Sequence, residues 1–404
     1  MTDPIRHLLR DIFNHDFTQI VDSDAFHAAF FSKNLTITDL HKVHNLVASQ
    51  QSGGIPASLA LPGNKAGTPF AILTQLHGNE SAGLAGIVLA MALWSAGKLE
   101  RDVIGVIGNT LAARQYFEAY AANPTAPQET RDAFRCGLAE DGSLLPDMNR
   151  TPIDFLDRKP TTHHIKRAQE LFALASRIWG IADIHTARGT MVCYTDHLRD
   201  GDLKHSPIRA ILTELAEAIS ANASTTVTVQ TFKTILGRLP NIQSQTGIEA
   251  GRHESPEAPT IAASFTLSLL HTLGITAIAP YMKTEDGIFD RYAVLPRITY
   301  ADLLADGPLA ADDQIYMAHE TKDGVVVQQY DEMQAVFKGQ VVAIAKPSNT
   351  LLRAPFDFAG IFWSKSAALY DKDPAVGPWP VAASNLANVK FCYPCQVSRI
   401  KIDF

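Results

Sequence analysis

The chain lacks several features that mark whole classes of protein. None of its apolar runs approaches the about 20 residues that a membrane-spanning helix needs, so we expect no membrane protein. The N-terminal stretch, residues 1–16, mixes acidic and basic residues and has no apolar signal-peptide core, which makes the cytoplasm the expected location. Lysine and arginine are scattered in a chain of net charge −7, and this distribution does not support nucleic-acid binding.

Cysteine is too scarce for a disulfide framework, with four residues in a chain of 404. Two of them, in Cys392-Tyr393-Pro394-Cys395, have the CxxC spacing of redox sites and of half zinc sites. This pair lies near the C-terminus, on no strand-to-helix turn, and the sequence has no second CxxC to complete a metal site. We therefore expect two reduced thiols in a late strand or turn.

The composition is that of a soluble globular protein, with 46% apolar and 19% charged residues and enough length for two domains. Residues 1–50 have apolar positions at helical spacing and predict a helical lead-in, with Thr36 or Thr38 as the cap of a short helix. Strand-like and helical runs then alternate. The expected strands are 71–76, 103–109, 181–185, 225–232 and 247–251, and the expected helices are 81–97, 111–120, 162–179, 207–221 and 259–273.

This alternation predicts an α/β fold, in which helices cover the faces of a sheet and sites form at the carboxyl ends of strands. After about residue 291 short strands such as 324–330, 340–345 and 358–363 are separated by Gly, Pro and Asp turns. We expect three parts: the lead-in (1–50), an α/β domain (51–290) and a smaller all-β C-terminal domain (291–404).

The most informative stretch is Leu76-His77-Gly78-Asn79-Glu80, which directly follows an apolar strand. His77 and Glu80 lie three residues apart, at the end of a strand and the start of a helical pattern, so both side chains can turn towards one point. Gly78 leaves room for the bend between them. Two such ligands need a third, since two His and one Glu with an open fourth position make a common hydrolytic zinc site.

A candidate for the third ligand lies about a hundred residues later, at the end of another buried strand. On a strand, residues two apart face the same side, so Asp183 and His185 point together. The carboxylate of Asp183 could accept the second ring N–H of a ligating His185 and hold its tautomer. These ligand types favour zinc, although cobalt or manganese would also bind them.

Two further segments carry charges that suit a hydrolase acting on an anionic substrate. Asn149 and Arg150, in a loop between the two ligand motifs, could hold a carboxylate. Glu249 ends an apolar strand between glycines and could take the proton of a zinc-bound water.

The four ordered motifs His77-Gly78-Asn79-Glu80, Asp147-Met148-Asn149-Arg150, Asp183-Ile184-His185 and Gly247-Ile248-Glu249-Ala250-Gly251 resemble those of the succinylglutamate desuccinylase/aspartoacylase family. That family is a branch of the zinc carboxypeptidase-like fold, whose mixed central sheet is flanked by helices. The resemblance covers residues 65–275, and the C-terminal region in architecture only. An aromatic that commonly follows the motif arginine is missing, because Arg150 is followed by Thr151-Pro152.

The resemblance implies a role for each matching residue. His77, Glu80 and His185 would bind one Zn²⁺ per chain, with Asp183 behind His185. Glu249 would be the general base and then the acid, and Arg135 would polarise the scissile carbonyl. Asn149, Arg150 and Arg238 would bind the substrate. In the case of Arg135, the segment 136–146 separates it from the Asp-x-Asn-Arg motif.

The function expected from this resemblance is hydrolysis of an amide in an N-acylated amino acid or similar small anionic molecule, with a succinyl or acetyl type of acyl group. Two alternatives remain open. A metallocarboxypeptidase acting on peptides would share the ligand set, and a non-catalytic homologue would bind the metal or a metabolite without turnover. We expect no nucleic-acid or membrane partner, and a homo-oligomer remains open.

Overall fold

A computed structural model describes residues 3–126, 131, 134–148, 159, 161–187, 192–194, 226–229, 244–280, 287–294, 298–327, 335–361 and 381–402. The chain divides into two compact units, the first mainly Met1–Ala187 and Met191–Phe289 and the second mainly Asp290–Ile400. The predicted helix 207–221 lies outside the described residues. Among the residues that are described, no helix has the length and apolarity needed to cross a membrane.

The first unit begins with three helices, α1 (Pro4–Phe13), α2 (Ser23–Phe30) and α3 (Ile37–Ala48), as the helical spacing of residues 1–50 predicts. Thr36 is the N-cap of α3, one of the two caps that the sequence offered. Its side chain accepts a hydrogen bond from the N–H of Asp39, while the Asp39 carboxylate accepts one from the N–H of Thr36. This reciprocal capping box satisfies two backbone donors at the start of the helix.

The sheet of the first unit is mixed. A short hairpin, β1 (Gln51–Ser52) and β2 (Ile55–Pro56), precedes it. Its strands are β3 (Ser58–Leu61), β4 (Lys65–Thr74), β5 (Arg101–Ile107), β6 (Gly180–Ala187), β7 (Val192–Tyr194), β8 (Thr226–Val229) and β9 (Ser244–Arg252). They lie in the order β8-β7-β9-β6-β4-β5-β3. β5, β4, β6 and β9 are parallel, whereas β3 pairs antiparallel with β5 and β7 with β9.

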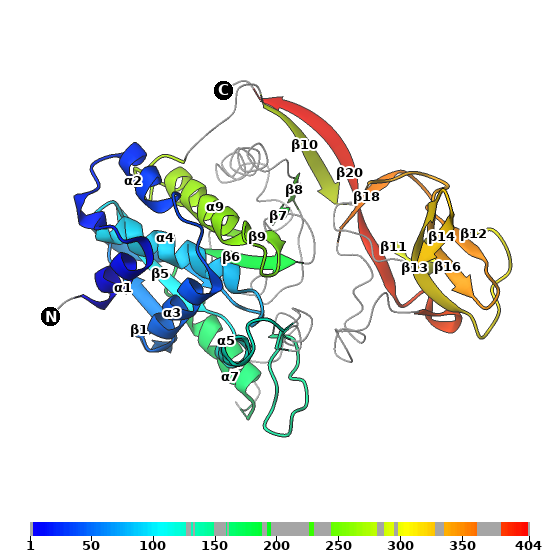
Figure 1. Cartoon of the computed structure of the whole chain (residues 1–404), viewed down its shortest axis with the longest axis horizontal. Coiled ribbons are helices and arrows are strands. Elements are labelled where there is room, and N and C mark those ends of the chain that lie inside the picture. Colours follow the sequence, from blue (N-terminus) through cyan, green and yellow to red (C-terminus); the bar gives the residue numbers. More distant parts are fainter. Residues whose placement is uncertain are drawn as a thin grey trace. The chain divides into compact units, whose positions relative to one another are not determined.

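Helices cover both faces of this sheet. α4 (Leu84–Ser95) and α9 (Ala258–Thr272) pack against each other on one face (Figure 1). The alternation of side chains along β4 decides which face each helix covers. Phe70 and Ile72 join the core of α4 and α9, while Ala71 and Leu73 join that of α7 (His163–Ala175). A further helix, α5 (Thr110–Ala122), follows β5.

The second unit is built from antiparallel strands. They are β11 (Ile298–Thr299), β12 (Leu304–Ala305), β13 (Gln314–Thr321), β14 (Gly324–Val327), β15 (Ala335–Val336), β16 (Val341–Lys346), β17 (Leu351–Arg353), β18 (Phe358–Ile361), β19 (Val381–Ala382) and β20 (Lys390–Ile402), with β10 (Gly287–Val294) at the boundary of the units. One sheet has the order β12-β17-β16-β13-β14, and β15, β18 and β20 are neighbours in another. The core of this unit contains Tyr300, Ile315 and Phe391.

These observations confirm the predicted fold class, an α/β unit with a mixed central sheet and a smaller all-β C-terminal unit. The CxxC pair lies within β20, so the expectation of a late strand is confirmed, and Cys392 is buried.

Candidate metal centre

The loop after β4 carries the first two predicted ligands. β4 ends at Thr74, and the short 3-10 helix η2 (Ser81–Gly83) begins directly after Glu80. Gly78, between the two ligands, has no room for a side chain, because a Cβ there would lie 2.4 Å from the carbonyl carbon and oxygen of Ala112. Glycine is therefore required by a close approach of backbones at this bend.

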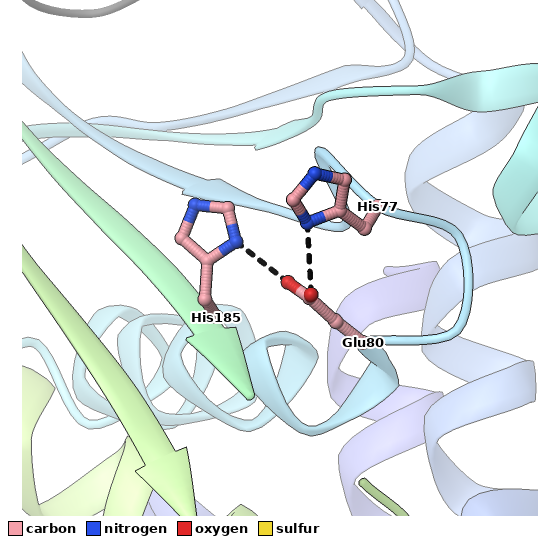
Figure 2. A group of neighbouring side chains, drawn as sticks. All are labelled: His77, Glu80 and His185. Carbon is pink, nitrogen blue, oxygen red and sulfur yellow. Dashed lines mark hydrogen bonds and ion pairs between the residues drawn. The ribbon is translucent and has the colours of Figure 1, made fainter. Parts of the chain in front are cut away.

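His185, on β6, completes a cluster with this loop (Figure 2). One ligand atom from each of His77, Glu80 and His185 lies within 4.8 Å of the others, and all three residues are buried. The Glu80 carboxylate lies between the rings: Oε1 is 2.8 Å from Nδ1 of His77 and Oε2 is 2.6 Å from Nδ1 of His185. The parallel pairing of β4 and β6 brings the two ligand motifs to the same edge of the sheet.

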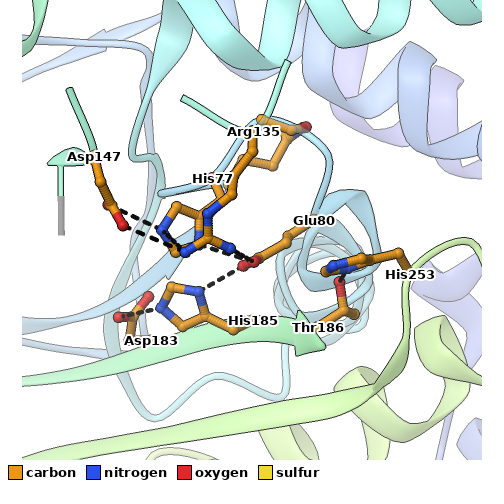
Figure 3. A network of polar contacts seen from close by, with 10 residues as sticks. His77, Glu80, Arg135, Asp147, Asp183, His185, Thr186 and His253 are labelled. Carbon is orange, nitrogen blue, oxygen red and sulfur yellow. Dashed lines mark hydrogen bonds and ion pairs between the residues drawn. The ribbon is translucent and has the colours of Figure 1, made fainter. Parts of the chain in front are cut away.

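The far side of each imidazole faces an aspartate (Figure 3). Nε2 of His185 is 2.7 Å from Oδ2 of Asp183, and Nε2 of His77 is 3.1 Å from Oδ1 of Asp147. A proton on each Nε2 would be held by these carboxylates, which leaves the Nδ1 atoms to bind an ion. The predicted orientation of Asp183 towards His185 is thus observed.

Charge stabilises the cluster despite its burial. Burial alone would lower the pKa of His185, but the carboxylates of Asp183 and Glu80 outweigh it and hold that pKa well above its usual range. Burial would also raise the pKa of Glu80, but the charges of His77 and His185 hold it well below the usual value. Glu80 is therefore ionised, and an ion that binds here must displace a proton from His185.

Arg135 reaches the cluster, although segment 136–146 separates it from Asp147 in sequence. That segment folds back on itself through an antiparallel bridge between Leu138 and Leu144. The guanidinium of Arg135 consequently lies 3.4 Å from Asp147, 2.8 Å from Nε2 of His77 and 3.4 Å from Glu80.

Glu249 lies on the neighbouring strand β9, as the Cα partner of His185 in a parallel pairing. Its neighbours Ile248 and Ala250 join the core of α4 and α9, so Glu249 points to the opposite face of the sheet, which it shares with His185. The backbones of adjacent strands are about 5 Å apart, and Glu249 is half-buried there. Three other predicted residues, Asn149, Arg150 and Arg238, lie outside the described residues.

Several polar residues of this region received no role from the sequence. Asp147 belongs to a motif that assigns it no role, and its contact with His77 depends on the fold-back of segment 136–146. Thr186 contacts the buried His253 (Oγ1 to Nδ1, 2.7 Å), beside the ligand His185 (Figure 3). Gln75 contacts His44 of α3 across 31 positions of sequence. No local pattern pointed to either contact.

Solved structures resemble most of the chain. The similar structures include succinylglutamate desuccinylase/aspartoacylase from Rhodobacter sphaeroides (TM-score 0.55, 18% identity, 84% of this chain and 89% of that chain covered). The ectoine utilization protein EutE (DoeB) from Ruegeria pomeroyi, in a product-bound structure, matches with a TM-score of 0.50 and 15% identity (84% and 88% covered). A succinylglutamate desuccinylase from Silicibacter sp. TM1040 matches with a TM-score of 0.50 and 16% identity (84% and 88% covered).

The chain has the fold of the succinylglutamate desuccinylase/aspartoacylase family. The resemblance seen in the four motifs is thereby confirmed at the level of fold. No family model matches the sequence, and no curated protein matches it.

The donor set fits the zinc that the desuccinylase/aspartoacylase fold implies. Two imidazoles and a carboxylate are zinc ligands, and three protein ligands leave a coordination position open, as catalytic zinc sites do. The aspartates behind the imidazoles are the partners that ligating histidines usually have. The cluster of His77, Glu80 and His185 could therefore hold one metal ion.

Proposed function

We propose that this protein is a zinc-dependent amidohydrolase that removes an acyl group, of succinyl or acetyl type, from an N-acylated amino acid or a similar small anionic molecule. The observation that carries the proposal is the convergence of His77, Glu80 and His185 at one edge of a sheet. It is supported by structural likeness to desuccinylase/aspartoacylase proteins over 84% of the chain.

In the proposed reaction, His77, Glu80 and His185 would hold the metal. Zinc in such a site acts as a Lewis acid and lowers the pKa of a water molecule to about 7. The Glu249 carboxylate would accept a proton from the attacking water and later donate it to the leaving nitrogen. Glu249 on β9 and His185 on β6 lie on the same face of the sheet, which supports this role.

Arg135 would act on the substrate carbonyl. Its guanidinium already lies against His77 and Glu80, so a carbonyl oxygen near the cluster would be within its reach. When Nδ1 of His77 binds an ion, its Nε2 carries the proton and can no longer accept from Arg135. We expect the guanidinium to turn then from His77 to the substrate. Asn149, Arg150 and Arg238 would bind the anionic part of the substrate.

The test is release of free amine from a panel of N-acetyl-, N-formyl- and N-succinyl-amino acids. We expect the zinc-loaded protein to hydrolyse an anionic member and the chelated protein to hydrolyse none. Glu249→Gln should keep its zinc and lose at least about a hundredfold in kcat, as expected for loss of a general base. The control is Glu118→Gln, at an exposed glutamate of α5, which should leave turnover unchanged.

Three other outcomes would contradict parts of this proposal. Undiminished turnover in Glu249→Gln would remove Glu249 from the mechanism. Release of C-terminal residues from peptides, with no release of acyl groups, would instead indicate a metallocarboxypeptidase, which uses the same ligand set. Stoichiometric zinc with no turnover of either substrate class would indicate a non-catalytic metal-binding homologue.

A further inference from the structure

The backbone of Gly78 is held from two sides. Its N–H donates to the carbonyl oxygen of Arg135 at 2.8 Å, and its carbonyl oxygen accepts from Nε2 of Gln75 at 3.3 Å. The backbone of Ala112 blocks movement on a third side. Because the two peptide units that flank Gly78 lie between His77 and Glu80, their orientation sets the angle at which the two side chains meet.

Gln75 has an unusual backbone for its residue type. Its φ is +52°, a left-handed conformation that glycine adopts freely and that residues with a Cβ adopt at a cost. Gln75 is also fully buried. A glycine would satisfy the backbone at this position, so what glutamine adds is its side chain, which reaches forward to the carbonyl of Gly78.

The other end of the Gln75 amide is held by the N-terminal helices. Oε1 of Gln75 is 3.1 Å from Nδ1 of His44, and because a glutamine oxygen only accepts, His44 must donate there. The His44 ring is buried on α3 and packs against the ring of Phe117, with 4.9 Å between the ring centroids. α3 also contacts η2, the turn that directly follows Glu80.

We infer that Gln75 is a positioning residue for the loop His77–Glu80 and that His44 holds Gln75 in place, which makes the N-terminal helical segment part of the metal centre. The inference rests on the metal site of the proposed function. The contacts form one chain, from His44 to Gln75 to the peptide between two ligands. A hydrogen bond with a purely structural role would affect only the stability of the fold. The bond from Gln75 to the carbonyl of Gly78 affects the geometry of the ligands around the ion.

The experiment uses cobalt(II) alone as the probe, with the full-length protein. The cobalt dissociation constant is measured by chelator competition, and the visible absorption of bound cobalt reports ligand geometry. Gln75→Met removes both hydrogen bonds of the Gln75 amide and keeps a side chain of similar length. His44→Leu removes the donor, and His44→Asn restores one, because the asparagine Nδ2 takes the place of the histidine Nδ1. Thr36→Ala is the control, since it removes the capping box of α3 without touching Gln75.

We expect Gln75→Met and His44→Leu to weaken cobalt binding about tenfold, the size typical of partners that orient metal ligands, and to change the spectrum. His44→Asn should recover both properties. Thr36→Ala should lower the unfolding midpoint but leave affinity and spectrum unchanged.

Wild-type affinity and spectrum in His44→Leu, together with a lowered unfolding midpoint, would overturn the inference even if Gln75→Met does not fold. Equal effects of His44→Leu and His44→Asn would also overturn it. Wild-type protein that binds no cobalt would contradict the proposed metal site itself, so the two failures are distinguishable.

Discussion

Replacing Asp183 with asparagine should weaken zinc binding about tenfold while preserving the shape of the site. Oδ2 of Asp183 lies 2.7 Å from Nε2 of His185, and both side chains are 2% exposed. A buried hydrogen bond to a charged group contributes about 1.5–3 kcal/mol, against about 1 kcal/mol for a neutral one. The difference between the charged and the neutral hydrogen bond, about 1.4 kcal/mol, corresponds to a factor of ten in the dissociation constant of zinc.

The assay is competition for zinc with a chelator at neutral pH, followed by the unfolding midpoint of the metal-free form. The comparison variant is Asp147→Asn, which weakens the equivalent contact to His77. The Asp147 side chain is 20% exposed and its contact is longer, 3.1 Å, so water screens it and we expect a smaller loss. A zinc affinity of Asp183→Asn within twofold of wild type would refute the reasoning that the carboxylate holds the tautomer of a ligating His185.

Three further predictions concern the support of the site. Gly78→Ala should weaken zinc binding and cost about 1–3 kcal/mol in unfolding experiments, because its Cβ would meet the backbone of α5, whereas Gly67→Ala, with open space around it, should be neutral. Burial lowers the pKa of His44 to about 4. Its neutral form therefore contributes about 3 kcal/mol to the free energy of unfolding above pH 6.5, and this contribution is lost as pH falls towards 4. His44→Asn should flatten this part of a stability–pH curve, and an unchanged slope would contradict the prediction. The guanidinium of Arg131 donates two hydrogen bonds to the carboxylate of Glu254, at 2.9 and 2.6 Å. Arg131→Met should therefore cost about 3 kcal/mol in denaturant unfolding, because it leaves that carboxylate without the guanidinium, and a loss below about 1 kcal/mol would show that this ion pair is dispensable.

Much of the fold could be predicted because local patterns carry it. Helical spacing marked the lead-in, and apolar runs marked β4, β6 and β9. The predicted helix 162–179 is observed as His163–Ala175, and 259–273 as Ala258–Thr272. The ends shifted because propensity and spacing locate a helix better than they locate its last turn.

Long-range contacts could not be predicted in the same way. The separation of Arg135 from Asp147 by eleven residues argued against their meeting, and the bridge between Leu138 and Leu144 removes that obstacle. The sequence pattern gives His44 no role at the site. Its link to Gln75 depends on where α3 packs, and no periodicity of either segment encodes that.

The sequence by itself determined which residues could serve as ligands. A strand end followed by His-Gly-Asn-Glu, and a later strand with Asp and His two apart, set their chemistry and the side of the strand on which they lie, since both are local properties of the backbone. Only the tertiary structure decided that His77, Glu80 and His185 meet. Their meeting requires β4 and β6 to pair in parallel and in register, and strand order is settled by the packing of the whole core.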